Sequence, residues 1–287
     1  MNIVYNNSDD NKKIVDNCLR EELQKINNFY DDCETIKPPF AIVDGRFGKM
    51  SVLRHRSTNK MYLQKTISMR HFSADEIKVH QLMGEHDNFV KLYFHYSSPV
   101  FNVLIMDYKK CRDLYELLPI MKFTTKRVAN IVRQLCCALN DLHKIGYVHN
   151  DIKLENVLYS ELLDHVYVCD YGLCKRENTK AIVHDGTLEY FSPEKFCKMP
   201  YSSSFDWYAV GILTYKLFTD NRHPFEKVPG EELEFDEMRR GQRYDDINVL
   251  NEVHDTNARN FIYQLTVYNY KRRLVTFNEI IKHKFIN

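Results

Sequence analysis

The first stretch of the chain repeats apolar residues at the spacing of one helix face. Residues 1–36 are otherwise polar and rich in Asn and Asp. The apolar positions on this face are Ile14, Val15, Cys18, Leu19, Leu23, Ile26, Phe29 and Tyr30. The pattern predicts a helix over residues 10–30 ahead of the main domain. Pro38 and Pro39 close the segment because proline cannot continue a helix. Such a helix packs on its own domain more often than it recruits a partner.

From residue 40 to residue 107 the apolar pattern becomes that of short strands. The predicted strands are Ala41–Val43, Lys49–His55, Lys60–Ile67 and Val100–Asp107. A helical stretch, Ala74–Met83, interrupts them. After Cys111 the helical period dominates and predicts helices over Thr125–Ile145, Trp207–Phe218 and Ala258–Val267. A small β-rich part followed by a larger α-rich part indicates the α+β class.

Composition and charge exclude several classes of protein. The 287 residues are 44% hydrophobic, which is enough for a substantial core. A formal net charge of +1 gives no reason to expect direct nucleic-acid or membrane binding. No apolar run is long enough to span a bilayer. The eight cysteines show neither Cys-x-x-Cys pairs nor zinc-ligand spacing, which favours free thiols and an intracellular, reducing compartment.

The chemistry of the chain concentrates in residues 149–156 and 169–172. Asp151, Lys153 and Asn156 are interleaved with apolar residues, and Asp170 follows the apolar run Val166–Cys169. Charges with apolar flanks are costly to bury unless they are paired or bind an ion. At these separations one carboxylate can orient a hydroxyl nucleophile, and the lysine can neutralise a moving phosphoryl group. The asparagine and the second carboxylate can hold Mg²⁺, so the pattern predicts phosphoryl transfer from ATP.

Other motifs are weak in isolation and gain meaning from their order. Gly45 and Gly48 stand between two predicted strands, where glycines let backbone N–H groups approach phosphates. Lys65 lies on the next strand, and an ion pair with Glu76 would fix it against the phosphates. Taken alone, such a lysine is usually a solvated surface residue, and the glycines usually form a turn. Further motifs follow in the order Gly186–Glu194, Asp206–Gly211, His223–Phe225 and Arg273.

With these motifs in this order, the chain resembles the eukaryotic protein kinase superfamily over residues 38–287. The resemblance implies a bilobal fold: a helical extension over 1–36, a small β-rich lobe with one main helix over 37–108, and a larger helical lobe over 109–287. It implies ATP with Mg²⁺, or with Mn²⁺ in its place. It assigns catalysis to Asp151, Lys153, Asn156 and Asp170, the last two as metal ligands. The residues it assigns to nucleotide binding are Gly45, Phe47, Gly48, Met50, Leu63, Lys65, Glu76, Met106, Asp107, Tyr108, Asp113 and Leu158.

Two features narrow the resemblance. Lys153, shortly after Asp151, and Thr187 in the Gly-Thr-x-Glu-Tyr segment resemble Ser/Thr-specific kinases. The string from His149 to Leu158 is similar to the baculovirus protein kinase 1 family. That family implies a viral kinase that acts late in infection, in the host nucleus and in association with nucleocapsids. Its implied substrate is a basic, arginine-rich DNA-packaging protein. The sequence does not indicate an oligomeric state.

The resemblance also assigns residues that face the protein substrate. Glu155, Thr187 and Glu189 are the residues assigned to the substrate side and the activation segment. Glu155 and Asp113 match acidic positions that favour arginine upstream of the acceptor. Lys216 occupies another such position with the opposite sign, so the substrate consensus is not readable from these residues.

Two structural contacts of the larger lobe are implied as well. Glu194 would form an ion pair with Arg273, for which Arg272 is an alternative. Asp206 would brace the catalytic loop, which we define as residues 149–156.

The chain departs from the superfamily in residues that bear on regulation. Val43 replaces the first glycine of the glycine-rich loop. Asn150 stands where an arginine usually clamps a phosphorylated residue of the activation segment, residues 170–194. Val183, which cannot be phosphorylated, occupies the usual phosphosite, with Thr179 as a nearby alternative. The losses at Asn150 and Val183 are consistent with each other, and together they predict an activation segment that does not depend on phosphorylation.

Two other functions compete with an active protein kinase. A pseudokinase would bind partners without chemistry, and the loss of the glycine at Val43 hints at this. Pseudokinases usually lack one of the four groups that Lys65, Asp151, Asn156 and Asp170 supply here. A small-molecule phosphotransferase would generally lack both the lysine at position 153 and the Gly-Thr…Pro-Glu segment that cradles a peptide. The sequence therefore favours an active Ser/Thr protein kinase.

Overall fold

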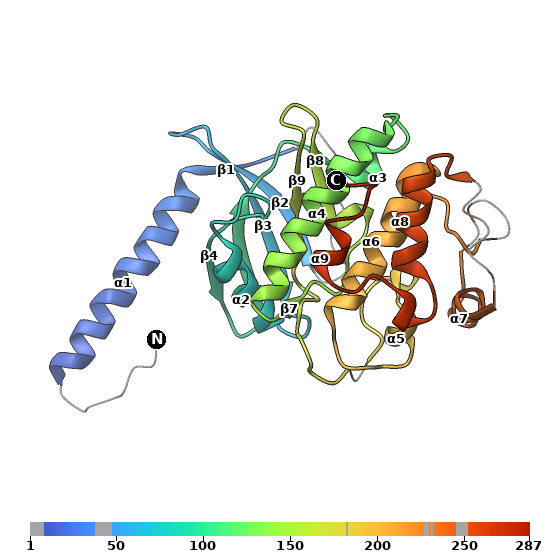
Figure 1. Ribbon diagram of the computed structural model, residues 1–287. Coiled ribbons are helices and arrows are strands. Elements are labelled where there is room, and N and C mark those ends of the chain that lie inside the picture. Colours follow the sequence, from blue (N-terminus) through green and yellow to red (C-terminus); the bar gives the residue numbers. More distant parts are fainter. Residues whose placement is uncertain (1–8, 38–47, 182, 227–229, 231, 245–251) are drawn as a thin grey trace. The chain divides into compact units, whose positions relative to one another are not determined.

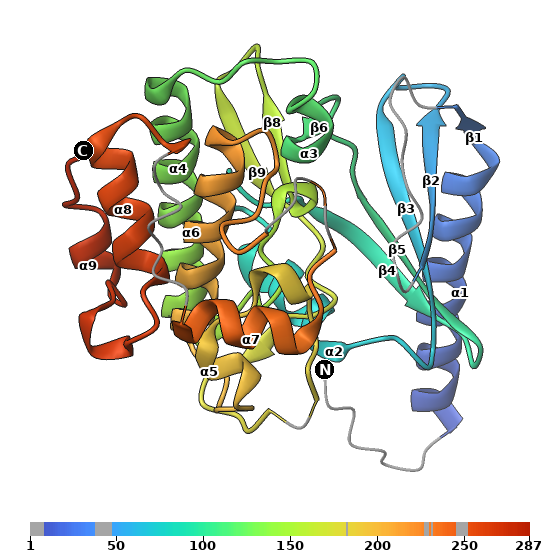
Figure 2. The same cartoon turned by 90° about the vertical axis from the view of Figure 1, so that its right-hand side faces the viewer.

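A computed structural model of the chain describes residues 9–37, 48–181, 183–226, 230, 232–244 and 252–287, with the backbone alone for residues 9–19 and 244. Internal contacts divide the chain into two units. The first unit comprises residues 1–69 and 93–108, and the second comprises residues 70–92 and 109–287. Figures 1 and 2 show the larger sheet in the first unit and most of the helices in the second.

The first unit is an antiparallel sheet with one long helix beside it. Its elements are α1 (Asp9–Asp31), β1 (Cys33–Ile36), β2 (Gly48–His55), β3 (Met61–Ser68), β4 (Leu92–Ser97) and β5 (Phe101–Asp107). Within the described residues the strand order is β1-β2-β3-β5-β4. Strand β3 is central, and it pairs antiparallel with both β2 and β5.

The end of α1 packs on the sheet of its own unit. Phe29 and Tyr30 lie against a buried cluster of Leu53, Val103 and Ile105. The Tyr30 hydroxyl donates a hydrogen bond of 2.8 Å to Gln64 Oε1 on β3. Leu23, which lies more than one turn earlier on α1, is 51% exposed. The predicted helix is therefore confirmed, and its last turns are joined to the sheet.

Strand β1 was not predicted, because its four residues lie within the segment expected to be a helical extension. Residues Cys33–Ile36 pair antiparallel with β2, in the register Cys33↔His55 to Ile36↔Val52. A strand this short carries almost no periodic signal of its own. Its pairing depends on a partner that follows only after the segment 38–47, which lies outside the described residues.

The second unit is mainly helical, with small sheets between the helices. Its helices are α2 (Ala74–Met83), α3 (Leu114–Leu117), α4 (Thr125–Lys144), α5 (Pro193–Phe196), α6 (Ser203–Phe218), α7 (Phe235–Tyr244), α8 (Thr256–Thr266) and α9 (Phe277–Ile280). Its strands are β6 (Arg112–Asp113), β7 (Tyr147–Val148), β8 (Val157–Ser160), β9 (His165–Val168) and β10 (Lys175–Arg176). Short 3₁₀ turns lie at η1 (Leu154–Asn156), η2 (Leu188–Tyr190) and η4 (Tyr270–Arg272).

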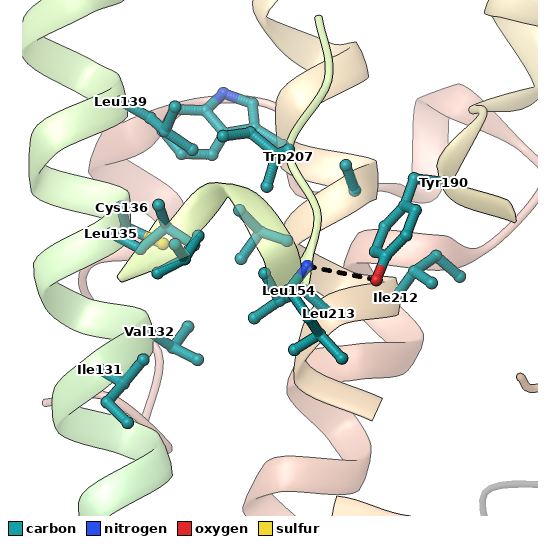
Figure 3. Close-up of a cluster of buried hydrophobic side chains, with 14 of the residues drawn as sticks. Ile131, Val132, Leu135, Cys136, Leu139, Leu154, Tyr190, Trp207, Ile212 and Leu213 are labelled. Atoms are coloured by element: carbon teal, nitrogen blue, oxygen red, sulfur yellow. Dashed lines mark hydrogen bonds between the residues drawn. The ribbon is translucent and has the colours of Figure 1, made fainter. Parts of the chain in front are cut away.

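The core of the second unit forms where α4, α6 and α8 meet. Helix α6 is buried along almost its whole length, and Trp207 is its largest buried side chain. Figure 3 shows Leu154, which comes from the catalytic loop, in one buried cluster with Trp207 and the inward face of α4. The loop is thus anchored in the main core through an apolar residue, which leaves its polar residues for other contacts.

Helix α2 groups with the second unit, although the sequence placed residues 37–108 in the β-rich part. The reason is packing: Val79 and Met83 belong to the same buried cluster as Phe89 and the α4 side chains. The expected bounds of α2 agree with the structure to the residue.

The other predicted elements are present with small shifts at their ends. Helix α6 begins at Ser203 rather than Trp207, because Ser202 caps it and polar residues fill its first turn. Strands β4 and β6 to β10 were not identified as a set, since most span only two to four residues. The predicted strand Ala41–Val43 lies outside the described residues. In the described part of the chain, no helix is both long and apolar enough to cross a membrane.

Candidate active site

Asp151 lies at the centre of a compact set of polar contacts. The amide of Asn156 donates to the Asp151 backbone carbonyl (2.7 Å) and to its Oδ2 (3.1 Å). The Thr187 hydroxyl donates to Asp151 Oδ1 (2.8 Å) and accepts from Lys153 Nζ (3.2 Å). Lys153 Nζ itself lies 3.6 Å from Asp151 Oδ2. The structure therefore brings together an oriented carboxylate and an ammonium group, as phosphoryl transfer to a hydroxyl requires.

Asp206 holds the start of the catalytic loop through hydrogen bonds. Its carboxylate accepts the backbone N–H groups of His149 and Asn150, both at 2.8 Å. It also contacts His143 Nε2 at 2.8 Å. Burial alone would raise the pKa of Asp206, but the hydrogen bond and charge of His143, with further help from the loop, lower it below its ordinary value. Asp206 stays ionised at neutral pH and braces the loop.

The middle of the loop is held by apolar packing and one further hydrogen bond. Leu154 is fully buried. Its backbone N–H donates to the Tyr190 hydroxyl at 3.3 Å, the dashed line in Figure 3. Tyr190 follows Thr187 closely in the sequence, so this bond joins the end of the activation segment to the loop.

Asn156 and Asp170 offer oxygen atoms of the kind that Mg²⁺ binds. Because Asn156 Nδ2 is committed to Asp151, its Oδ1 remains as an acceptor. Asp170 is exposed and has a left-handed backbone (φ 58°). The Cys169 N–H donates to the Asn156 carbonyl at 3.0 Å, which ties the start of the activation segment to the loop. Mg²⁺ is usually held by one or two carboxylates with waters and phosphates, so these residues fit it. Among the described residues, no cluster of three or more His, Cys, Asp or Glu could form another metal site.

The expected ion pair at the end of the activation segment is present. Arg273 Nη1 lies 2.8 Å from Glu194 Oε2. The guanidinium also donates to the carbonyls of Val267 (3.0 Å) and Tyr268 (3.1 Å). The alternative, Arg272, donates instead to the Tyr263 hydroxyl. Arg273 therefore joins the activation segment to the end of α8.

The acidic residues expected to face a substrate differ in their surroundings. Glu155 is exposed, whereas Asp113 is half-buried and accepts the Glu116 N–H at 2.8 Å as the N-cap of α3. Burial raises the pKa of Asp113 to about 6, and the charges of Glu116 and Glu155 act in the same direction. Lys216, the basic residue at a position where an acidic one was expected, forms an ion pair of 2.6 Å with Glu189 and neutralises its charge.

The residues assigned to nucleotide binding fall on both units. On the sheet of the first unit, Met50 stands opposite Lys65, and Leu63 stands opposite Met106. Next to Met106, Asp107 ends β5 and Tyr108 follows it. In the second unit, Asp113 pairs with Leu158 across β6 and β8, and Glu76 lies on α2.

Parts of that assignment stay predictions. Gly45 and Phe47 lie outside the described residues. Gly48 is described, and a Cβ there would lie 2.8 Å from the Thr66 carbonyl, so the backbones of β2 and β3 approach closely. Lys65 and Glu76 are each buried, at 4% and 2% exposure, and their ion pair stays a prediction.

Comparison with known proteins identifies the family. The profile of the "Protein kinase domain" family matches residues 41–286. The chain belongs to the protein kinase family. It is 53% identical over 267 residues to "Serine/threonine-protein kinase 1" of Orgyia pseudotsugata multicapsid polyhedrosis virus, covering 92% of this chain and 96% of that protein. The protein of the same name from Heliothis zea nuclear polyhedrosis virus is 37% identical, covering 92% and 98%.

A solved structure agrees with these relatives. The kinase resembles "Structure of the Cydia pomonella Granulovirus kinase, PK-1" with a TM-score of 0.82 and 30% identity, covering 93% of this chain and 99% of that one. The protein kinase fold and the resemblance to the baculovirus family are thus confirmed. The protein is a serine/threonine-protein kinase.

Sequence reasoning missed three residues that shape this site. Lys195 is buried, and its amine donates to Asn150. His143 contacts Asp206, and Tyr190 accepts from the loop. Their positions in the sequence carry little signal, since a lysine after Glu194 or a histidine in the last turn of α4 is typical of a solvated surface.

Proposed function

We propose that this kinase transfers the γ-phosphate of ATP to Ser and Thr hydroxyls of a basic, arginine-rich protein, and that its activation segment needs no phosphorylation. The contact set at Asp151 carries the proposal. Asn156 and Thr187 hold the carboxylate in one orientation, so that it can accept the hydrogen bond of an incoming hydroxyl. Lys153 lies beside it and offsets the charge that develops on the phosphoryl oxygens.

ATP and a divalent metal are the cofactors that protein kinases use in general. Asn156 Oδ1 and the Asp170 carboxylate would hold Mg²⁺, or Mn²⁺ in its place. When bound, the ion supplies positive charge that offsets the negative charge of the nucleotide phosphates. Lys65 on β3 would anchor the phosphates.

Contacts within the activation segment support independence from phosphorylation. Val183 is 58% exposed and has no hydroxyl to modify. The Asp185 carboxylate accepts from the Tyr201 hydroxyl (3.0 Å) and lies 3.9 Å from Lys175 Nζ. The Asp185 carboxylate of the activation segment therefore accepts a hydrogen bond from Tyr201, which lies beyond the segment, and lies near the Lys175 cation, as a phosphate group would.

The acidic residues Glu155 and Asp113 support a basic substrate, because arginine side chains pair with carboxylates. The resemblance to the baculovirus protein kinase 1 family implies an arginine-rich DNA-packaging protein as substrate, and we extend the proposal to it. We also propose, on that resemblance, action in the host nucleus, late in infection and on nucleocapsids.

The proposal is tested by transfer of labelled γ-phosphate to protamine, an arginine-rich protein, with casein as the acidic comparison. We expect incorporation into serine and threonine of protamine, and loss of signal in Asp151→Ala and Asp170→Ala. Asp236→Ala, an exposed aspartate on α7, is the matched control and should keep the signal. Equal signal from all variants would identify a pseudokinase with a contaminating activity.

The same assay tests the activation segment. Enzyme treated with phosphatase, and the Thr179→Ala variant, should keep the activity of the untreated enzyme. Thr179 is exposed, and its hydroxyl already donates to the Arg176 carbonyl at 2.7 Å. Abolished activity after either change would contradict independence from phosphorylation.

A further inference from the structure

Lys195 is a buried lysine whose amine is aimed at the catalytic loop. It lies in the short helix α5 and is 6% exposed. Its Nζ donates to both the backbone carbonyl and Oδ1 of Asn150, each at 2.7 Å. The Nζ also lies 4.5 Å from the centre of the Phe191 ring. Burying an ammonium group is costly unless its N–H groups find partners. Here the amine has two oxygen acceptors on Asn150 and the aromatic face of Phe191.

These bonds complete the fixation of Asn150, the residue directly before Asp151. The Asn150 N–H donates to Asp206 at 2.8 Å, and its Nδ2 donates to the Leu173 carbonyl at 3.0 Å. The backbone at Asn150 is left-handed (φ 69°), a conformation that asparagine tolerates better than most residues. Lys195 takes the remaining polar atoms, so the peptide plane that leads into Asp151 has one orientation.

The activation segment passes directly over this contact. A Cβ on Gly186 would lie 2.7 Å from Lys195 Nζ and 2.9 Å from the Asn150 carbonyl. Gly186 precedes Thr187, whose hydroxyl bonds Asp151. A small cavity lined in part by Asn150, Asp151 and Lys195 borders the contact. Polar bonds, rather than close apolar packing alone, therefore set the position of the loop here.

We propose that Lys195 is a positioning residue of this kinase, which holds Asn150 and thereby Asp151 in place of a phosphorylated activation segment. The proposal rests on the proposed function. In the arrangement that the superfamily implies, a loop cation would clamp an anion on the segment. Here the positions of donor and acceptor are exchanged. The cation is Lys195, which follows the activation segment, and it donates to the oxygen atoms of Asn150 on the catalytic loop.

Four charged groups on neighbouring elements act on the amine. They are Asp185 of the activation segment, Asp151 of the catalytic loop, Asp206 of α6 and Lys175 of β10. Burial lowers the pKa of Lys195 to about 8, against the attraction of the three carboxylates. The amine is charged below this pH, where it offsets the carboxylates, and loses that charge as pH rises through about 8. The activity of the wild-type kinase should therefore fall on the alkaline side.

The test measures kcat and KM of the full chain with protamine between pH 6.5 and 9.5. Lys195→Met keeps the length and removes the amine, and we expect kcat at pH 7 to fall about tenfold or more with little change in KM for ATP. Asn150→Asp is nearly isosteric and places an anion beside the amine, so the alkaline fall in kcat should move up by about one pH unit or more. Lys198→Met is the matched control, because Lys198 is exposed just beyond α5.

The outcomes of these measurements distinguish the positioning role of Lys195 from the proposed function. Lys198→Met should show the wild-type rate and pH profile, and Lys195→Met should show no alkaline fall. An alkaline fall that persists in folded Lys195→Met, or an unchanged kcat, would overturn the positioning role. If Lys195→Met does not fold, an unshifted profile in Asn150→Asp overturns it. A wild-type chain without activity would contradict the proposed function instead.

Discussion

Thr187 touches both Asp151 and Lys153 with a single hydroxyl. It donates to Asp151 Oδ1 at 2.8 Å and accepts from Lys153 Nζ at 3.2 Å. Thr187→Ala removes both bonds, so we expect kcat to fall about 10- to 100-fold with stability nearly unchanged. Thr187→Ser keeps the hydroxyl and should retain most of the activity. Steady-state kinetics with protamine check this, and similar kcat values for the two variants would show that the hydroxyl is not required.

Asp113 provides a second prediction at the scale of one residue. Its pKa is raised to about 6, first by burial and then by neighbouring acidic groups, so it becomes neutral below this pH. If it pairs with arginine in the substrate, KM for protamine should be higher at pH 5 than at pH 7. The expected change is about fivefold, which corresponds to about 1 kcal/mol for a partly exposed ion pair.

Asp113→Asn separates this charge effect from the structural role of the side chain. Asparagine caps a helix as well as aspartate does, so α3 should be preserved. The variant should show the higher KM at both pH values. A wild-type KM that does not change between pH 5 and pH 7 would argue that Asp113 acts only as the cap of α3.

The residues of the site were predictable to the extent that their chemistry is encoded by local spacing. Asp151, Lys153 and Asn156 lie within one loop, and their contacts follow from that proximity. Lys195 could not be identified in this way. Nothing local distinguishes it from a solvated lysine, and its burial arises only when α5 folds against the loop forty-five residues earlier in the chain.

At the scale of elements, the long helices were predictable because a helical period repeats several times within each of them. Helix α4 ends one residue before its predicted limit, and its cap at Thr124 precedes the apolar run. The short strands lacked such repetition. Strands β6 and β7 have two residues each, and partners elsewhere in the second unit define them. Strand β4 alternates in burial, but only over six residues.

The contact between α6 and α8 gives a prediction about packing. A Cβ on Gly211 of α6 would lie 2.6 Å from Thr266 Cγ2 and 2.9 Å from Leu265 Cβ on α8. Gly211→Ala should therefore lower the free energy of unfolding by about 1–3 kcal/mol. Its better helix propensity, about 1 kcal/mol, offsets part of this loss. Urea unfolding measures the difference.

A second substitution tests whether this close approach is the cause. Thr266→Ser removes the clashing methyl group and keeps the hydroxyl that donates to the Ile262 carbonyl at 2.8 Å. The double variant should recover part of the stability lost in Gly211→Ala. If the double variant loses the sum of the stabilities lost in the two single variants, the close approach of α6 and α8 is not the cause of the loss in Gly211→Ala.

At the scale of the whole molecule, the order of a β-rich part and a helical part follows from the change in apolar period along the chain. The fold was therefore predictable in outline. The grouping of α2 was not, because it depends on Val79 and Met83 meeting Phe89 and α4 in one buried cluster. Periodicity shows that a helix has an apolar face but not which core receives it.

The stability of the folded chain should fall in acid because of His223. This residue is 3% exposed, its Nε2 donates to the Glu189 carbonyl at 3.0 Å, and its Nδ1 accepts the Phe225 N–H at 3.2 Å. Burial, together with the charge of Lys216, lowers its pKa to about 3. Below its ordinary pKa of 6.5, His223 becomes protonated in the unfolded chain but stays neutral in the folded chain. Stability is thus fully present above that pH and is lost as pH falls toward 3.

His223→Gln tests this contribution because glutamine can keep both hydrogen bonds without titrating. Between pH 7 and pH 5 the wild type should lose about 2 kcal/mol of unfolding free energy through this group. The variant should lose correspondingly less, whereas His254→Gln, at an exposed histidine, should behave as the wild type. Equal acid sensitivity in His223→Gln and wild type would show that other groups carry the effect. A smaller sensitivity would show that the neutral His223, whose Nε2 donates to the Glu189 carbonyl, carries part of the loss of stability in acid.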